Sequence, residues 1–271
     1  MSAMDYYDQA EEQLTAFTRS AVRTKIMLRL KDVEMTAGEL EKEMNIRSTT
    51  ILHAMKEMID AGLVSKKDTS YSLSNIGKIQ TILLDELVAA IVLLNQHEDY
   101  WLSHDLSAIP ENLLAAIGML ARSRRITSDP IAPLKSLENF MTELSKAKNI
   151  RGVSSFVAPG FPELIKDCVK RGTKVDLILT DAILKLVSKE HFILLKDLQG
   201  FDNFKLYHLG LDVNIGFTVT ESLLALGLYR IDGGIDLGSE LICIGETATK
   251  WGNDLFEYYK SRSELIQHYA H

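Results

Sequence analysis

The sequence predicts a multidomain protein that joins an α+β part to an α/β part. Three observations carry this prediction. The length of 271 residues corresponds to about two domains. Helical periodicity followed by a short basic hairpin precedes residue 75, and strands alternate with helices after residue 148. We therefore expect an N-terminal domain over residues 1–74, a helical linker over 75–148 and a C-terminal α/β domain over 149–271.

The composition is typical of a globular protein of the reducing cytoplasm. Hydrophobic residues make up 46% of the chain and charged residues 25%, which argues against disordered and collagen-like classes. No apolar run reaches 18 residues without a charge, and the acidic start Met1–Asp5 lacks the order of a signal peptide, so we expect no membrane association. Cys168 and Cys243 have no Cys or His at zinc-ligand spacing. We therefore expect neither disulfides nor a bound metal or cofactor.

The net charge of −7 is unevenly distributed along the chain. Residues 1–18 contain four acids and no Lys or Arg. Residues 19–78 contain 11 Lys and Arg against 8 Asp and Glu, a net of +3, whereas residues 79–271 have a net of −6. An acidic total argues against a nucleic-acid partner, but phosphate contact depends on where the charges cluster, and one short block is basic.

Local signals predict the first two helices of this basic block. Residues 21–30 place apolar side chains on one helical side and Arg23, Lys25 and Arg29 on the other. Thr36 and Glu39 have the spacing of a capping box, so a second helix should begin there. It should stop near Asn45, because asparagine tolerates the left-handed backbone conformation at a helix end.

A third helix and a hairpin follow after a short turn. The helix opens with Arg47–Thr50, where Ser48 is a candidate N-cap, and ends at Gly62. Its predicted apolar face consists of Ile51, Leu52, Met55, Met58 and Ile59. Alternating residues over 63–67 and 70–73, on either side of the turn Asp68–Thr69, predict a two-stranded hairpin with two lysines near its tip.

This order of helix, capped helix, turn, helix and basic hairpin is typical of a winged helix-turn-helix domain. A third helix of this kind enters the major groove, where short polar side chains reach base edges, and lysines of the wing reach flanking phosphates. The candidate DNA-binding residues are Arg47, Ser48, Thr49, Thr50, His53, Lys56, Lys66 and Lys67. A helix-turn-helix also serves as a protein-interaction module with a solvated outer face, and this alternative stays open.

The middle of the chain is predicted to be helical and to form a dimer. Residues 75–101 contain no proline and carry apolar side chains at helical spacing over a broad face, which must be buried against something. Helix-turn-helix proteins usually bind paired half-sites as two-fold dimers, so we predict a homodimer; packing within the chain is the alternative. His97 and His104 lie about 10 Å apart along a straight helix, too far to share one metal ion.

Another helix is expected to begin at Pro110 and to run through Leu120, since proline is favoured at the first helical position. Three arginines follow it, at positions 122, 124 and 125. They could hold an anion, but a solvated helix end is the simpler interpretation.

The C-terminal domain alternates strands and helices. Strands are predicted over 150–157 and 174–180, each followed by a helix, over 162–170 and 182–195, which implies parallel pairing. Further strands are predicted over 204–209, 215–219, 223–231 and 237–244, and a last helix over 247–269. The turn at 232–234 should join the last two strands as an antiparallel hairpin.

Ligands of such a sheet bind at the carboxyl ends of its parallel strands. Ala158 and Pro159 stand at one strand end, and the candidate effector-binding residues are Thr180, Asp181, Asn214, Thr218, Tyr229 and Asp232. For each singly, a structural role competes: Asp181 could only cap a helix, and Asp232 could only form the turn. The chain has no Gly-x-Gly-x-x-Gly, Walker or Gly-x-Ser-x-Gly motif, so we expect a sensing domain rather than an enzyme.

Four strings of residues resemble a known family. They are Ser20–Leu28, Trp101–Glu111, Leu226–Gly233 and Trp251–Tyr259, and the resemblance spans nearly the whole chain. The chain is similar to archaeal winged-helix transcriptional regulators of the methanogenesis-regulator type. The C-terminal domain also resembles, in strand order, the phospholipase-D-like sensor domains of sugar-responsive archaeal regulators. The His-x-Lys signature of the phospholipases is absent, which argues against phosphodiesterase activity.

Together these features predict a DNA-binding transcriptional regulator. We expect it to be a cytoplasmic homodimer that binds double-stranded DNA and carries a C-terminal domain for a small-molecule effector. The alternative is an enzyme-like or protein-interaction module that uses its helix-turn-helix for docking.

Overall fold

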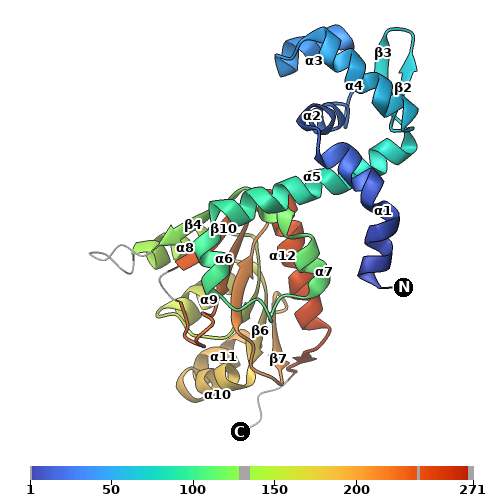
Figure 1. Cartoon of the computed structure of the whole chain (residues 1–271). Coiled ribbons are helices and arrows are strands. Elements are labelled where there is room, and N and C mark those ends of the chain that lie inside the picture. Colours follow the sequence, from blue (N-terminus) through green and yellow to red (C-terminus); the bar gives the residue numbers. More distant parts are fainter. Residues whose placement is uncertain (1, 128–134, 237–238, 268–271) are drawn as a thin grey trace. The chain divides into compact units, whose positions relative to one another are not determined.

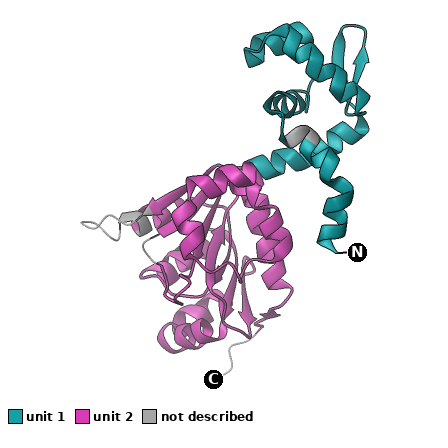
Figure 2. Ribbon diagram, viewed as in Figure 1, with its two compact units in different colours: residues 1–88 teal, residues 89–271 magenta. Residues whose placement is uncertain are grey.

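The computed structural model describes residues 2–127, 135–236 and 239–267. The chain divides into two compact units, residues 1–88 and 89–271 (Figures 1 and 2). The division falls within α5 (Asn75–Gln96), a helix of 22 residues. Residues 75–148, the predicted linker, are thus shared between the two units. The predicted roles of the three segments 1–74, 75–148 and 149–271 stay a prediction.

The three helices and the hairpin predicted over residues 21–73 are confirmed. Before α5, the unit contains, in chain order, α1 (Ala3–Thr18), α2 (Ala21–Arg29), β1 (Met35–Thr36), α3 (Ala37–Met44), α4 (Ser48–Asp60), β2 (Val64–Lys67) and β3 (Ser70–Leu73). The short strand β1 was not predicted, and it pairs antiparallel with β3 at the side of the sheet opposite to β2. The hairpin is therefore anchored to the start of α3.

Local chemistry explains where these helices begin and end. Thr36 and Glu39 form the predicted capping box, and Asn45 ends α3 in the left-handed conformation at φ 52°. Gly62, at φ 71°, turns the chain out of α4 into β2. The predicted N-cap at Ser48 is wrong by one residue: Arg47 holds the N-cap position and makes no side-chain cap, while Ser48 is the first helical residue.

The core of unit 1 is formed by one side of each of the helices α2, α3 and α4 and by the inner side of the hairpin. Ile26, Met27, Leu40, Ile51 and Met55 are almost fully buried in it. The predicted apolar face of α4 is wrong at two positions. Leu52 is 46% exposed and Ile59 is 37% exposed, because they lie at the border of the face that packs on α2 and α3.

Unit 2 is a single mixed sheet with helices on both faces. After the end of α5, its helices are α6 (Glu98–Ser103), α7 (Glu111–Ala115), the 3-10 helix η1 (Ile117–Leu120), α8 (Lys135–Leu144), α9 (Phe161–Lys170), α10 (Asp181–Glu190), α11 (Phe192–Leu198) and α12 (Glu246–Lys260). Its strands are β4 (Ser123–Thr127), β5 (Asn149–Ser154), β6 (Lys174–Thr180), β7 (Phe204–Leu209), β8 (Ile215–Val219), β9 (Leu223–Leu228), β10 (Ser239–Ile244) and β11 (Glu264–Leu265).

The eight strands lie in the order β11-β7-β6-β5-β8-β9-β10-β4. The predicted parallel pairing of β5 with β6 is confirmed, and β7 continues it. The predicted antiparallel hairpin of β9 and β10 is confirmed as well. The strand direction changes between β5 and β8, which are antiparallel. The core on one sheet face includes side chains of α6, α7 and α12, and the core on the other includes side chains of α9, α10 and α11 (Figure 1).

Several predicted boundaries in unit 2 are wrong because tertiary contacts override local preference. The long helix expected over 75–101 breaks at His97, whose imidazole Nε2 lies 3.0 Å from Ser123 Oγ. The helix expected over 182–195 breaks likewise at His191. Of the three arginines after Leu120, Arg124 and Arg125 belong to the edge strand β4, and the exposed Arg122 lies in the turn before it.

Three further boundaries shift. Pro110 is the N-cap of α7 rather than its first residue, and the helix expected to run through Leu120 ends at Ala115, before the 3-10 helix η1. The helix expected over 247–269 ends at Lys260, and a two-residue strand, β11, pairs with β7. Residues 268 and 269 of that expectation, and 237–238 of the expected strand 237–244, lie outside the described residues.

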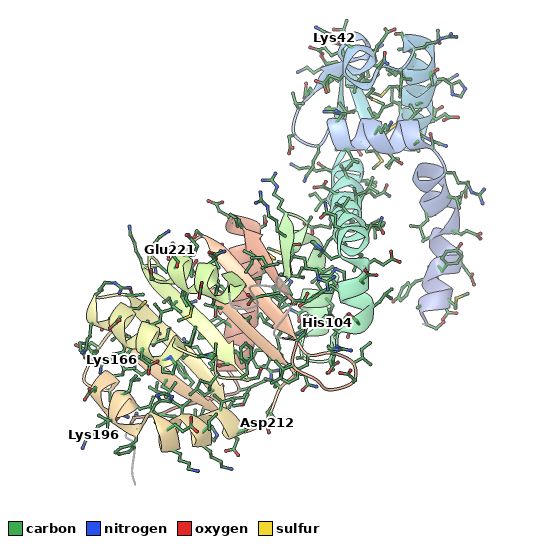
Figure 3. The ribbon with its side chains drawn as sticks, turned by 90° about the vertical axis from the view of Figure 1, so that its left-hand side faces the viewer. Lys42, His104, Lys166, Lys196, Asp212 and Glu221 are labelled. Atoms are coloured by element: carbon green, nitrogen blue, oxygen red, sulfur yellow. The ribbon has the colours of Figure 1, made fainter. Side chains whose placement is uncertain are left out.

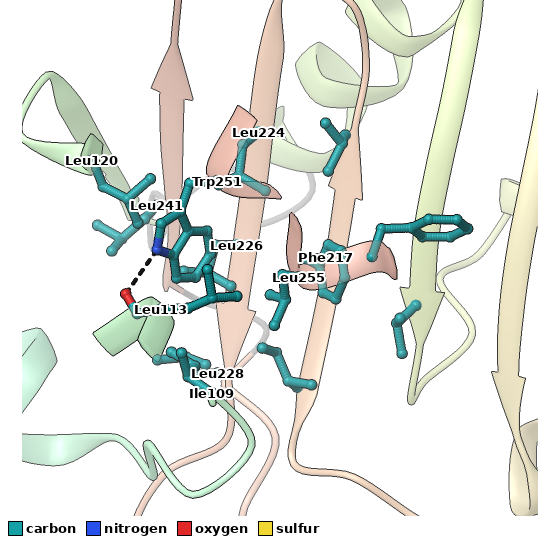
Figure 4. Close-up of a cluster of buried hydrophobic side chains, with 14 of the residues drawn as sticks. Ile109, Leu113, Leu120, Phe217, Leu224, Leu226, Leu228, Leu241, Trp251 and Leu255 are labelled. Atoms are coloured by element: carbon teal, nitrogen blue, oxygen red, sulfur yellow. Dashed lines mark hydrogen bonds between the residues drawn. The ribbon is translucent and has the colours of Figure 1, made fainter. Parts of the chain in front are cut away.

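The largest buried side chain of unit 2 is Trp251 on α12. Its ring lies among leucines of β9 and β10, and its Nε1 donates a hydrogen bond of 2.9 Å to the carbonyl oxygen of Leu113 in α7 (Figure 4). Buried indoles usually find such a partner, because an unpaired N–H away from water is costly. This bond joins α12 to α7 over the antiparallel half of the sheet.

Two carboxylates mark the opposite ends of the sheet. Glu221 lies at the amino end of β5, where it accepts hydrogen bonds from the backbone N–H groups of Lys148 and Asn149 at 3.1–3.2 Å. Asp212 follows β7 and lies 3.5 Å from the N–H of Ala182, just after the carboxyl end of β6. Figure 3 labels both, at the two ends of unit 2. The end near Asp212 is the one at which a ligand site is expected.

Candidate nucleic-acid interface

The predicted DNA-binding residues form two groups in unit 1, on α4 and on the hairpin next to it. We call this set the α4–hairpin surface; it consists of Arg47, Ser48, Thr49, Thr50, His53, Lys56, Lys66 and Lys67. All are exposed except Ser48, which is half-buried. α4 contacts β2, so the two groups belong to neighbouring elements. The surface presents short polar and basic side chains, the chemistry that contacts bases and phosphates.

The amino end of α4 is partly satisfied from within the unit. Glu41 of α3 accepts a hydrogen bond of 3.3 Å from the backbone N–H of Ser48 through its Oε1. A carboxylate near a helix N-terminus is favourable because the first N–H groups lack partners and the helix dipole is positive there. Sequence reasoning missed Glu41, since its contact crosses the turn between α3 and α4 and has no fixed spacing.

The carboxyl half of α4 is held by an ion-pair network. Glu57 lies 3.5 Å from Arg23 of α2 and 3.7 Å from the Nδ1 of His53. His53 itself is 77% exposed at its side chain, so it can reach outward as predicted. The exposed second half of α4 carries Glu57 and Asp60, which repel phosphate. The part of α4 suited to base contacts is therefore its first two turns, and Lys56 follows directly after them.

The two lysines of the hairpin are not equivalent. Lys66 pairs across the hairpin with Tyr71, and its Nζ lies 5.5 Å from the centre of that ring. Lys67 pairs with Ser70 on the opposite face of the hairpin. Side chains of successive residues alternate across a strand, so a partner on one face of the hairpin contacts one lysine and not both. Asp68, at φ 53°, lies in the exposed turn that joins Lys67 to Ser70.

In unit 2, two of the predicted effector residues lie at the carboxyl end of β6. Thr180 is buried and holds the N-cap position of α10 without a side-chain cap, so Asp181 is not the predicted cap but the first helical residue. Asp181 lies 2.5 Å from Lys185 Nζ and 3.3 Å from His208 Nε2. The hydrogen bond from Lys185 and, to a smaller extent, His208 lower the pKa of this carboxyl. Asp181 is thus engaged with its neighbours.

Two more of the predicted effector residues meet at the carboxyl end of β5. Asn214 donates a hydrogen bond of 2.9 Å from its Nδ2 to Asp105 Oδ2, and Tyr229 donates one of 2.9 Å from its hydroxyl to the carbonyl oxygen of Ser155. The backbone N–H of Asp105 donates to the carbonyl oxygen of Tyr229 at 2.8 Å. The pKa of Asp105 is lowered, mainly by the hydrogen bond from Asn214. Sequence reasoning missed Asp105, which precedes the sheet by many residues.

The remaining predicted residues do not join this group. Thr218 lies in the middle of β8 opposite Gly152, and its side chain is largely buried. Asp232 lies in the β9–β10 connection, where it pairs with Arg230 at 3.2 Å and accepts a hydrogen bond from the N–H of Gly234 at 3.0 Å. Ala158 is buried and Pro159 is exposed in the loop before α9.

A small cavity lies between the sheet and the helices α9, α10 and α11. Its volume is about 50 Å³, and its walls include Phe161, Ile165, Leu179, Leu194 and Leu206. Sites for drug-sized ligands usually measure about 300–1,000 Å³ and add a few polar groups to an apolar lining. The cavity is therefore too small for such a ligand without movement of the helices that cover it.

Metal and thiol chemistry find little support in the described ranges. Within residues 2–127, 135–236 and 239–267, no three His, Cys, Asp or Glu side chains are placed to hold one ion. Cys168 and Cys243 are free and buried. Burial raises the pKa of both thiols, that of Cys243 to about 12, so both are unreactive near neutral pH. Among the helices that the structure describes, none is both long and apolar enough to cross a bilayer.

Two family models match this chain. The N-terminal domain of the methanogenesis regulatory protein FilR1 matches residues 11–92, and its middle domain matches residues 133–262. The methanogenesis regulatory protein FilR1 of Methanothrix harundinacea (strain 6Ac) is 36% identical over 267 residues, which cover 97% of this chain and 60% of that protein. The chain thus spans about three fifths of the length of this curated relative.

Solved structures show weaker likenesses. A structure of TrmBL2, described as an archaeal chromatin protein with a novel mode of DNA binding, is 14% identical with a TM-score of 0.43, over 96% of this chain and 99% of that one. An O-methyltransferase family protein from Burkholderia thailandensis is 11% identical with a TM-score of 0.28, over 79% of this chain and 65% of that one. TM-scores of this size bear on neither fold nor function.

Proposed function

The chain belongs to the family of the methanogenesis regulatory protein FilR1, whose N-terminal and middle domains it carries, and from this premise we propose that it is a DNA-binding transcriptional regulator. In this proposal unit 1 is a winged helix-turn-helix domain, α4 enters the major groove, and the β2–β3 hairpin is the wing. The observation that carries it is the α4–hairpin surface. Within the described residues, the side chains of Arg47, Thr49, Thr50 and Lys56 make no hydrogen bond or ion pair.

The roles on this surface follow from side-chain length and charge. Thr49, Thr50 and His53 are short, and they lie on the first two turns of α4, the part of a recognition helix that reaches base edges. Arg47, at the N-cap position, and Lys56 carry their charge on longer stems, which suits phosphate contacts on either side of the groove. Lys67 points its charge to the face of the wing opposite to Tyr71. We assign sequence preference to the first set and affinity to the second.

The regulator is proposed to act as a homodimer through α5. Ile76, Ile79, Leu83, Leu87 and Leu94 recur at helical spacing along one side of this helix and are 41–65% exposed. Together with Ile82 and Ile91, which flank them, these side chains expose on the order of 700 Å² of apolar surface, against about 800 Å² per partner in a standard interface. A second copy of α5 offers the same self-complementary stripe, as a two-fold interface requires.

Unit 2 is proposed to be the sensing domain for a small-molecule effector. The best-supported part of the predicted site is the group Asp105, Asn214 and Tyr229, where polar side chains from three segments meet at the change of strand direction. The resemblance to phospholipase-D-like sensor domains stays a prediction, as does the absence of enzymatic activity. A DNA partner also implies the cytoplasm as the place of action.

Selection of duplexes from a random library by the full-length protein, followed by fluorescence anisotropy of the best duplex, tests the proposal. We expect binding whose affinity falls steeply with salt, because phosphate contacts release counterions. Lys56→Ala with Lys67→Ala should lower the salt slope by about one to two and weaken all duplexes alike. Thr50→Ala should change which sequences are preferred.

The matched control for the lysines is Lys185→Ala with Lys250→Ala, which removes two exposed lysines of unit 2. This control should leave the salt slope unchanged. Absence of binding to any duplex at low salt would reject the proposal and favour the protein-docking alternative. A control that lowers the slope as much as the test variant would reject the assignment to unit 1.

Light scattering coupled to size exclusion tests the dimer. Leu83→Glu with Leu87→Glu places two charges on the α5 stripe and should convert the dimer to a monomer. The matched control is Ile193→Glu, because Ile193 is 77% exposed on α11 in unit 2. A dimer that survives the α5 charges, or a wild-type monomer, would reject this interface.

A further inference from the structure

Leu52 is an apolar side chain in the middle of the α4–hairpin surface. It is 46% exposed, although the sequence pattern assigns it to the buried face of α4. Its neighbours at three and four residues along the helix are Ser48, Thr49, Met55 and Lys56, and of these only Met55 is buried. Side chains three and four residues apart are neighbours on a helix surface. Leu52 therefore stands beside the polar side chains proposed to contact DNA.

The core of unit 1 does not explain why a leucine occupies this position. The buried side of α4 is formed by Ile51, Ala54, Met55 and Met58, which are at most 5% exposed. Leucine is enriched in cores, and an exposed one that borders a binding surface is informative only if the partner offers a matching apolar group. On base edges in the major groove, that apolar group is the 5-methyl of thymine.

We propose that Leu52 packs against the 5-methyl group of a thymine and so selects duplexes with thymine at one position of each half-site. This inference rests on the proposed function, because it requires α4 to lie in the major groove. Leu52 is the fifth residue of α4, within the first two turns that reach base edges. On the same flank, Thr49 offers only one methyl group beside its hydroxyl, and Lys56 offers an alkyl stem that ends in a charge, so Leu52 is the larger apolar group.

The exposed Ile59 provides the contrast within the same helix. It lies two turns further on, on the same flank of α4, and is 37% exposed. Its surroundings include Asp60, and Glu57 lies on the same half of the helix. These acids disfavour phosphate next to Ile59, so we expect Ile59 to lie outside the base contacts. Ile59 is therefore the matched control: a similar apolar side chain on the same helix without a base contact.

Replacement of thymine by deoxyuridine removes the methyl group and leaves every hydrogen-bonding group of the base pair in place. Burial of one methyl group contributes about 0.8 kcal/mol, which is about a fourfold change in affinity. The wild-type protein should bind about fourfold more weakly when the contacted thymine is replaced. Deoxyuridine at positions away from Leu52 should have no effect.

The experiment uses the full-length protein and the duplex selected from a random library. Each thymine of the duplex is replaced singly by deoxyuridine, and the affinity is measured by anisotropy for wild type, Leu52→Ala and Ile59→Ala. We expect one position per half-site at which wild type and Ile59→Ala distinguish thymine from deoxyuridine. Leu52→Ala should bind the thymine duplex more weakly and bind both duplexes equally.

Three results would overturn the inference while leaving the proposed function intact. The first is that no single replacement of thymine by deoxyuridine changes the affinity of the wild-type protein. The second is a thymine preference that survives in Leu52→Ala, and the third is a thymine preference that is lost in Ile59→Ala. If Leu52→Ala instead changes the oligomeric state in light scattering and keeps the thymine preference, Leu52 contacts protein and the inference is wrong. If no duplex is bound at low salt, the proposed function fails first. Circular dichroism checks that both variants keep their helix content.

Discussion

Unit 1 and unit 2 use their polar side chains in different ways. On α4 of unit 1, the side chains of Thr49, Thr50 and Lys56 point into solvent without a partner among the described residues. At the carboxyl edge of the sheet in unit 2, Asp181 and Asn214 are already bonded to neighbours in their own unit. A binding surface gains most when its polar groups are not satisfied beforehand, because a bond to a partner then replaces only water. This difference makes unit 1 the stronger candidate for contact with a macromolecule.

The same difference predicts how the edge of unit 2 would respond to an effector. A ligand that binds there must compete with the bonds of Asp105 to Asn214 and of Asp181 to Lys185. It would therefore rearrange the loops that carry these residues rather than fill a prepared hollow. Such a rearrangement is what an effector needs in order to shift a protein between two states.

The largest expected effect concerns the largest fully buried side chain of unit 2. Trp251→Ala removes a fully buried indole and its hydrogen bond to Leu113, and should lower the free energy of unfolding by about 3–5 kcal/mol. Trp251→Phe keeps most of the apolar volume and should cost less. Urea unfolding followed by far-ultraviolet circular dichroism measures both. A loss below about 1 kcal/mol for the alanine variant would show that the core around Trp251 does not hold unit 2 together.

Glu240 of unit 2 differs from Asp181 and Asn214 in that it lacks such a bonded neighbour among the described residues. It is half-buried in β10, and the structure gives it no hydrogen bond or ion pair with another described residue. Burial raises its pKa to about 7 from an ordinary value of 4.5. Because the folded state favours the protonated form, its contribution to stability is full below pH 4.5, falls as the pH rises to about 7, and is constant above that.

Glu240→Gln should remove this pH dependence. Glutamine keeps the shape and is neutral at every pH, so the variant should match wild type at pH 4 and exceed its free energy of unfolding by about 2 kcal/mol at pH 8, a value reduced for partial access to water. Urea unfolding at pH 4, 6 and 8 gives the difference between the two proteins. If the free energies of unfolding of the two proteins differ by the same amount at all three pH values, the carboxyl of Glu240 is solvated.

A smaller effect is expected in unit 1 from the capping box of α3, in which two residues hydrogen-bond to each other reciprocally. Thr36 Oγ1 accepts a hydrogen bond of 3.3 Å from the N–H of Glu39, and Glu39 Oε2 accepts one of 2.7 Å from the N–H of Thr36. Thr36→Ala should lower stability by about 1 kcal/mol, the usual effect of losing an N-cap. Thr36→Ser keeps the hydroxyl and should be close to wild type. Equal melting temperatures for all three proteins would show that this cap does not limit the stability of unit 1.

The capping box also makes a pH prediction. Hydrogen bonds from Thr36 lower the pKa of Glu39 below 4.5. The stability that they contribute is present above the ordinary pKa of glutamate and is lost as the pH falls through the lowered value. The difference between wild type and Thr36→Ala in melting temperature should therefore shrink in acid. The stability contributed by Glu39 falls as the pH falls, whereas the stability contributed by Glu240 falls as the pH rises.

The sequence predicted unit 1 almost element by element, because its signals are local. The capping box at Thr36, the left-handed end at Asn45 and the glycine at Gly62 each act within one turn of the chain. What the sequence could not place is contact between elements. The bond from Glu41 to the start of α4 and the exposure of Leu52 depend on how α3 and α4 pack, and no fixed spacing encodes them.

In unit 2 the parallel strands were predictable and the sheet edges were not. β6 is a continuous apolar run, and its parallel pairing with β5 follows from the helix between them. β4 and β11 are held by partners far along the chain, β10 and β7, so their local sequence gave little sign of them. The candidate site shows the same limit: Asn214 and Tyr229 were predicted, but Asp105, which bonds to both segments, lies more than 100 residues away.

The smallest expected effect tests the comparison of the units most directly. Asp232→Ala in unit 2 and Lys56→Ala in unit 1 each remove one exposed charge, and each should change the free energy of unfolding by less than about 0.5 kcal/mol without DNA. Asp232 has an ion pair with Arg230, but surface pairs of this kind contribute little. In the absence of a partner, the two variants should therefore be indistinguishable in thermal unfolding.

Addition of the selected duplex should separate these two variants. A ligand that binds the folded state raises stability by an amount that depends on its concentration relative to the dissociation constant. The duplex should stabilise Asp232→Ala as much as wild type, whereas Lys56→Ala, bound about threefold more weakly, should gain about 0.7 kcal/mol less. Melting temperatures with and without duplex measure both gains. Equal gains for the two variants would mean that Lys56 is as uninvolved in DNA binding as Asp232, and would reject its assignment to the α4–hairpin surface.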